Sequence, residues 1–215
     1  YGTVVDCVVD NNSVKNHYYG GGIYMQKACL VERTVVTNNF CRNYTYGNIC
    51  GGGTGVYING GTLRNSVVAF NDGNKIDINY VLLTPAIGVY ANGGTVENST
   101  IYGNTCGNGA YAGFAGLTAV SGVKIVNTLV VANGNPETGF VSDFSGDETV
   151  LDHSIVNPPV NQYRLDDSGI PVPVLGSVLV DSGVETSTSA TAADLAGNQR
   201  TLGAAVDVGA YEFVE

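Results

Sequence analysis

The sequence predicts an all-β fold: a single-stranded parallel β-helix, a solenoid of about six coils with a C-terminal cap. A motif of one polar residue, one small residue and β-branched residues begins at positions 6, 33, 65, 98, 127 and 152, so its spacing runs from 25 to 33 residues. Repeats of this length indicate a solenoid. The 30 glycines and the short runs of Val, Leu and Ile favour strands and turns over helices.

The faces of each coil follow from the alternation of side chains along a strand. One position is always β-branched and is therefore expected to point inward: Val9, Val36, Val68, Ile101, Val130 and Ile155. The residues just before it vary in polarity and are expected to point outward: Val8, Val35, Val67, Thr100, Leu129 and Ser154.

Small and polar positions complete the repeat. An internal stack is expected from Cys7, Thr34, Ser66, Ser99, Thr128 and His153. Asn65, Asn98 and Asn127 fall at a bend, where asparagine tolerates a left-handed backbone. A second set marks the next turn: Asn11, Asn38, Asn71, Asn104, Asn133 and Asn157.

The chain divides into coils over residues 1–157 and an irregular segment over residues 158–215 of the same domain. Pro158, Pro159, Pro171 and Pro173 break regular strand pairing in the second part. Because bare strand edges invite aggregation, residues 158–215 are expected to cover the open end of the solenoid.

Tyrosines form the candidate binding site. Tyr24, Tyr57 and Tyr90 recur at an outward strand position and are expected to face solvent, roughly 4.8 Å apart on consecutive coils. Insertions at 12–21, 40–53, 72–86, 105–115 and 134–142 leave one corner and would form a wall of loops beside this row. The wall would carry Tyr18, Tyr19, Tyr44, Tyr46, Tyr80, Tyr111 and Phe114. The row is either a ladder that stabilises the sheet or a platform for sugar rings.

Catalytic patterns are weak by comparison. A polysaccharide lyase needs a base and cations beside a uronate, and the chain has only nine Lys and Arg residues. A glycoside hydrolase needs two facing carboxylates, and the adjacent pair Asp166 and Asp167 is better explained by a turn. His153 is interpreted as a member of the internal stack rather than as an acid or base.

Candidate ion sites and cysteines give little information about function. No cofactor or metal site is expected, although the loops with Asp72 and Asp77 or with Asp143 and Asp147 could bind calcium weakly. The five cysteines leave at least one unpaired within the chain, and Cys41 and Cys50 could form a disulfide that closes one loop. The net charge of −10 disfavours nucleic acid.

The tail carries a family resemblance. Its three segments 175–183, 194–200 and 206–212 resemble the closing part of secreted bacterial β-helix proteins of the choice-of-anchor and polymorphic outer membrane protein-like type, within the pectate-lyase-like superfamily. The resemblance implies a right-handed helix and a secreted or cell-surface location, with adhesins and polysaccharide-active enzymes among the relatives. Ala196, where an Asp is more usual, argues against calcium in this loop.

These observations together predict a non-catalytic, adhesin-like surface protein that binds a glycan or another surface partner along the tyrosine face. The alternatives are a polysaccharide lyase or glycoside hydrolase in the same groove, and a structural stalk. The sequence shows no transmembrane segment or signal peptide, and we expect a monomer or part of a longer chain.

Overall fold

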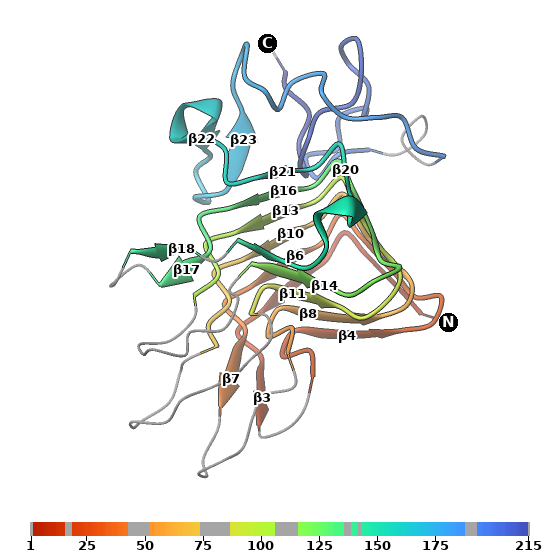
Figure 1. The fold of residues 1–215 in the computed structure, drawn as a ribbon, viewed down its shortest axis with the longest axis vertical. Helices are drawn as coiled ribbons and strands as arrows, with labels where there is room; N and C mark the ends of the chain where they lie inside the picture. The colour runs from red at the N-terminus through yellow and green to blue at the C-terminus, as the bar shows by residue number, and fades with distance from the viewer. Residues whose placement is uncertain are drawn as a thin grey trace.

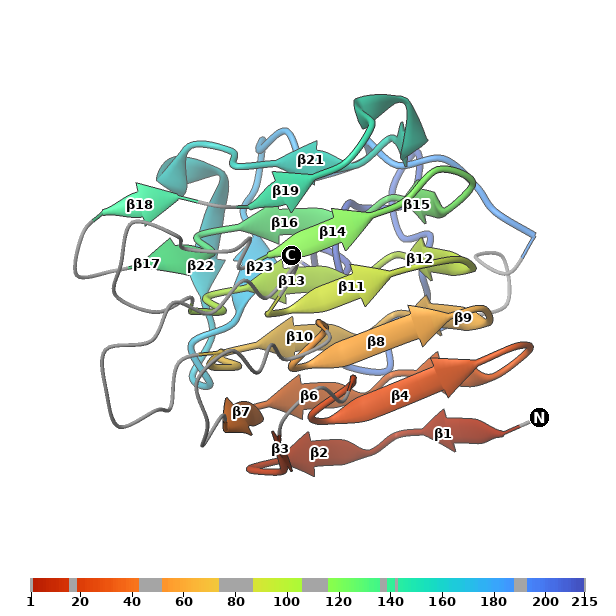
Figure 2. The ribbon, with the colours of Figure 1, turned by 60° about the horizontal axis from the view of Figure 1, so that its bottom comes forward.

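A computed structural model of the chain has the expected all-β solenoid fold. It describes residues 2–15, 19–42, 52–73, 87–105, 116–135, 139–141, 143–187 and 193–214. Three parallel sheets form the sides of a roughly triangular coil, which Figure 1 shows nearly end-on and Figure 2 from the side.

The three sheets are built from short strands stacked in parallel. The first sheet contains β1 (Thr3–Val5), β5 (Leu30–Glu32), β9 (Thr62–Arg64), β12 (Thr95–Glu97), β15 (Lys124–Val126) and β20 (Leu151–Asp152). The second contains β2 (Val8–Asp10), β6 (Val35–Thr37), β10 (Val67–Ala69), β13 (Thr100–Tyr102), β16 (Leu129–Val131) and β21 (Ile155–Val156). The third contains β4 (Ile23–Gln26), β8 (Val56–Asn59), β11 (Val89–Ala91), β14 (Leu117–Ala119) and β19 (Phe144–Ser145).

The regular part of the solenoid is shorter than the six predicted coils. Four coils have strands of three or more residues on all three sides: β4–β6, β8–β10, β11–β13 and β14–β16. Among the described residues, the first turn contributes only β1 and β2 to the three sheets, and the last turn contributes the two-residue strands β19, β20 and β21. The sequence motif marks both terminal turns because each still contains part of a coil.

Short elements lie outside the three sheets. β3 (Ser13–Lys15) pairs with β7 (Phe40–Arg42) in parallel, and β17 (Gly134–Asn135) pairs with β18 (Phe140–Val141) antiparallel. In the tail, β22 (Tyr163–Leu165) and β23 (Pro171–Pro173) form a hairpin-like pair. Two single-turn 3₁₀ helices, η1 (Glu148–Val150) and η2 (Val160–Gln162), are the helical content of the described chain.

The inward aliphatic position is confirmed for five coils. Val9, Val36, Val68, Ile101 and Val130 are register partners across the second sheet, and the last four are fully buried. The prediction for the last coil was wrong by one residue, because Val130 pairs with Val156 and Leu129 pairs with Ile155.

The same shift affects the bend and the internal stack. Asn65, Asn98 and Asn127 have the expected left-handed backbone, with φ between 46° and 48°, and His153 (φ 47°) takes this bend position in the last coil. Ser154 therefore replaces His153 in the stack, where its hydroxyl accepts a hydrogen bond from the Thr128 amide at 3.0 Å. The first stack position also differs from expectation, since Cys7 is exposed on the terminal turn.

Buried asparagine side chains join successive coils. The side-chain oxygens of Asn39, Asn71, Asn104 and Asn133 each accept hydrogen bonds from the backbone and side-chain nitrogens of the asparagine one coil before, and Asn12 is the first donor of this ladder. The second predicted set marks this turn, but it combines two positions, because Asn11, Asn38 and Asn157 adopt the left-handed turn position just before the ladder. Asp143 ends the ladder by accepting both hydrogen bonds from Asn133 at 2.8 Å.

The C-terminal segment packs against the side of the solenoid. Val67 and Ala69 of β10 form a buried cluster with Ile170 and Ala210, and Leu129 and Val131 of β16 form another with Leu179 and Val208. Figures 1 and 2 show the tail outside the second sheet. The described contacts thus lie along a lateral face, whereas an end cover was expected, because the outward residues of the middle coils are apolar.

Candidate functional site

The three predicted tyrosines lie in register on the outer face of the third sheet. Tyr24 pairs with Tyr57, and Tyr57 pairs with Tyr90, on consecutive strands β4, β8 and β11. The ring centroids are 5.3 Å apart at both steps, with interplanar angles of 6° and 9°. The period-2 pattern therefore predicted this row correctly.

The exposure of the row differs from the prediction. Tyr24 is 48% exposed, but Tyr57 is only 6% exposed, and Tyr90 is half-buried. Tyr19, from the segment before β4, packs across Tyr57 with a centroid distance of 4.3 Å. Burial raises the pKa of Tyr57 above its usual value, the neighbouring tyrosines add to this effect, and a hydrogen bond with Asn92 opposes it.

The stacking also determines which ring surfaces a ligand can reach. Parallel rings on adjacent coils turn their faces toward one another, so both faces of Tyr57 are occupied by Tyr24 and Tyr90. Tyr24 and Tyr90 therefore present ring edges and hydroxyl groups outward, whereas Tyr19 covers Tyr57. The face of Tyr24 that points away from Tyr57 is the part of the row best placed for stacking against a sugar ring.

A second polar row lies beside the tyrosines and was missed by the sequence prediction. Gln26, Asn59 and Asn92 lie two residues after each tyrosine, so they point to the same face, and all three are exposed. The Asn92 side-chain nitrogen donates to the Asn59 oxygen at 3.3 Å. The signal was present in the sequence, because an amide follows each tyrosine at the same strand spacing.

The predicted loop wall lies largely outside the described residues. Tyr44, Tyr46, Tyr80 and Tyr111 all fall in segments that the structure does not describe. Cys41 is buried and disulfide-bonded, while Cys7 and Cys29 are free thiols. Cys50 is outside the described residues, so a bond between Cys41 and Cys50 stays a prediction.

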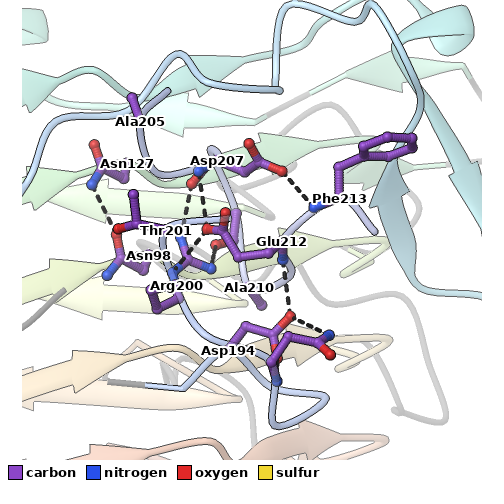
Figure 3. Close-up of polar contacts among 12 residues, drawn as sticks. Asn98, Asn127, Asp194, Arg200, Thr201, Ala205, Asp207, Ala210, Glu212 and Phe213 are labelled. Atoms are coloured by element: carbon purple, nitrogen blue, oxygen red, sulfur yellow. Dashed lines mark hydrogen bonds and ion pairs between the residues drawn. The ribbon is translucent and has the colours of Figure 1, made fainter. Parts of the chain in front are cut away.

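The tail contains a network of buried charges (Figure 3). Arg200 is fully buried, and its guanidinium donates to the carbonyl oxygens of Gly209 at 3.0 Å and Asp207 at 2.8 Å. Its Nε lies 3.2 Å from the Glu212 carboxylate. Burial raises the pKa of Glu212 to about 8, against the effect of the adjacent guanidinium.

Perturbed carboxyl groups are typical of active sites, but this network is enclosed by protein. The Asp207 carboxylate accepts hydrogen bonds from the Asp181 and Phe213 amides, and the Asp194 carboxylate accepts one from the Glu212 amide. These contacts fasten the turns of the tail to one another. Since Arg200 and Glu212 are both buried, the network is structural.

The remaining sequence candidates have simple structural roles. Asp166 closes a turn by accepting from the Ser168 and Ile170 amides, as predicted. His153 Nδ1 lies 2.6 Å from the Asp152 carboxylate on the exposed bend. Within the described ranges, no group of three or more His, Cys, Asp or Glu residues could hold a metal ion.

Comparison with known proteins does not assign the chain to a family. No protein-family model, no curated protein and no solved structure matches it. The described part of the chain also contains no helix long and apolar enough to cross a membrane. The class of protein defined by the fold is a parallel β-solenoid.

Proposed function

We propose that this protein is a non-catalytic extracellular or cell-surface β-helix protein that binds a glycan chain on the outer face of its third sheet. The observation that carries the proposal is the double row of tyrosines and exposed amides across β4, β8 and β11. The resemblance of the tail to secreted bacterial β-helix proteins supports the location and an adhesin-like role.

The chemistry of the two rows suits a polyhydroxylated ligand. Carboxamides carry both a donor and an acceptor, so Gln26, Asn59 and Asn92 can each engage a sugar hydroxyl in either direction. Successive coils repeat these groups at about 4.8 Å, which favours a ligand made of repeated units. The face of Tyr24 that points away from Tyr57 would stack on the apolar face of a terminal ring.

A glycan array screened with the wild type and single variants tests the proposal. Tyr24→Ala and Asn59→Ala change exposed side chains, so both variants should fold normally. Each variant should bind the glycan at least about tenfold more weakly than the wild type. Leu175→Ala is the matched control, because Leu175 is 73% exposed on the tail. Tyr57 is left intact, since its burial would confuse loss of binding with loss of stability.

Two results would contradict this function. Wild-type protein that binds no glycan on the array, or equal binding by Tyr24→Ala, Asn59→Ala and the control, removes the basis for a third-sheet site. Release of reducing or unsaturated sugars from a polysaccharide panel would instead support the lyase or hydrolase alternative.

A further inference from the structure

A second hollow, separate from the tyrosine face, opens where the second sheet ends. It has a volume of about 470 Å³, and its lining includes Asp10, Asn38, Phe40, Phe70, Asp72 and Thr105. These residues come from successive coils, because Asp10 ends β2, Asn38 follows β6 and Phe70 follows β10. Parallel bridges join Phe40 to Asp72 and Asp72 to Thr105. The hollow therefore runs along the solenoid axis.

Phe70 is the unusual residue in this hollow. It occupies the left-handed turn position with φ 56°, which a bulky side chain rarely adopts. The equivalent positions on the other coils hold Asn11, Asn38, Gly103, Ala132 and Asn157. The fold thus accepts a small residue or an amide at this turn and does not require an aromatic ring. A strained position of this kind often marks a functional site.

The surroundings of the ring make room for it. Phe70 meets Tyr102 edge-on, with centroids 5.5 Å apart. A Cβ atom on Gly103 would lie 3.0 Å from two atoms of the Phe70 ring, so glycine at that turn leaves the space that the ring uses. Packing accounts for one side of Phe70, but the side chain remains 36% exposed and lines the hollow.

Polar groups lie in the same hollow as the ring. The Asn38 side-chain nitrogen donates to the Asp10 carboxylate at 2.8 Å, and both residues are exposed. Asp72, on the third coil, is half-buried. Carboxylate and amide oxygens accept hydrogen bonds from hydroxyl groups, and an exposed aromatic ring covers an apolar surface. This combination matches the two kinds of surface on a pyranose ring.

The charge of the hollow limits the class of sugar that it can bind. The exposed carboxylate of Asp10 lines the hollow. The whole chain carries a net charge of −10. A uronate would therefore be repelled, whereas a neutral sugar would not.

We propose that this hollow is a binding site for a neutral pyranose. The exposed part of Phe70 lies against the apolar face of the sugar ring. Asp10 accepts hydrogen bonds from the sugar hydroxyls, and Asn38 donates hydrogen bonds to them. The site lies at the end of the second sheet and does not depend on the tyrosine face.

Calorimetric titration of the whole chain with cellohexaose, maltohexaose, mannohexaose and hexagalacturonate tests this site. The expected result is binding of at least one neutral hexasaccharide and weaker or no binding of hexagalacturonate. Phe70→Asn places a residue suited to the turn and should therefore fold, while weakening that binding about tenfold or more. Asp10→Ala changes an exposed residue and should weaken it similarly.

Val8→Ala is the matched control, because Val8 is 70% exposed on the same strand as Asp10. Tyr24→Ala separates the two sites, since binding at the hollow should survive this change on the third sheet. Equal affinities for wild type, Phe70→Asn and Asp10→Ala, or tighter binding of hexagalacturonate than of every neutral chain, would overturn the assignment. Failure of the wild type to bind any of the four would do the same.

Discussion

The asparagine ladder makes a quantitative prediction for Asn104→Ala. The Asn104 side chain donates to the Val68 carbonyl at 3.0 Å and to the Asn133 side-chain oxygen at 2.8 Å. Its own oxygen accepts from the Asn71 backbone nitrogen at 3.1 Å and from the Asn71 side chain at 2.8 Å. At roughly 1 kcal/mol for each of these four bonds, the free energy of unfolding should fall by about 4 kcal/mol.

Asn12→Ala is the control, because it removes the exposed first member of the same ladder. Asn12 donates to the Asn39 side chain from a position on the terminal turn, so its removal should cost about 1 kcal/mol. Urea denaturation measured by circular dichroism gives both values. If Asn104→Ala is no more destabilising than Asn12→Ala, the ladder does not hold the coils together as described.

Two further predictions concern buried carboxyl groups. Burial raises the pKa of Glu212 in the folded protein from 4.5 to about 8. The contribution of Glu212 to stability should therefore be full below pH 4.5 and be lost as the pH rises through 8. Urea titrations across this range should show this decline in the wild type and a flatter profile in Glu212→Gln. Burial also raises the pKa of Asp143, whose Oδ2 has no hydrogen-bond partner. Asp143→Asn should therefore raise the melting temperature at pH 7 and have less effect near pH 4. An unchanged or lower melting temperature at pH 7 would argue against this reasoning.

Periodicity predicted most of the solenoid because each coil repeats the same order of inward and outward positions. The inward position on Val36, Val68, Ile101 and Val130 follows from alternation alone. The last coil was misaligned because Asp152, His153 and Ser154 offer two ways to match a polar residue followed by a small one. In the observed register Ser154 is the small residue of the motif and His153 is the polar one.

The tail contacts could not be derived from the repeat, although one signal was present. β10 and β16 are apolar at all three positions, which indicates burial on both faces of a strand. The candidate site was only partly predictable for a different reason. Alternation puts Tyr57 on the outer face, but it carries no information about Tyr19, which comes from a preceding segment and covers the ring.

The lateral position of the tail has a consequence for how the molecule unfolds. In a solenoid each coil contacts only its neighbours, so coils can open one at a time from either end. Here the Ala210 amide donates to the Thr100 hydroxyl across 110 residues of sequence, and the Gly209 amide donates to the Asn127 carbonyl. These contacts tie β10, β13 and β16 into one cooperative unit, while β2, where Val8 is exposed, stays outside it and can fray independently.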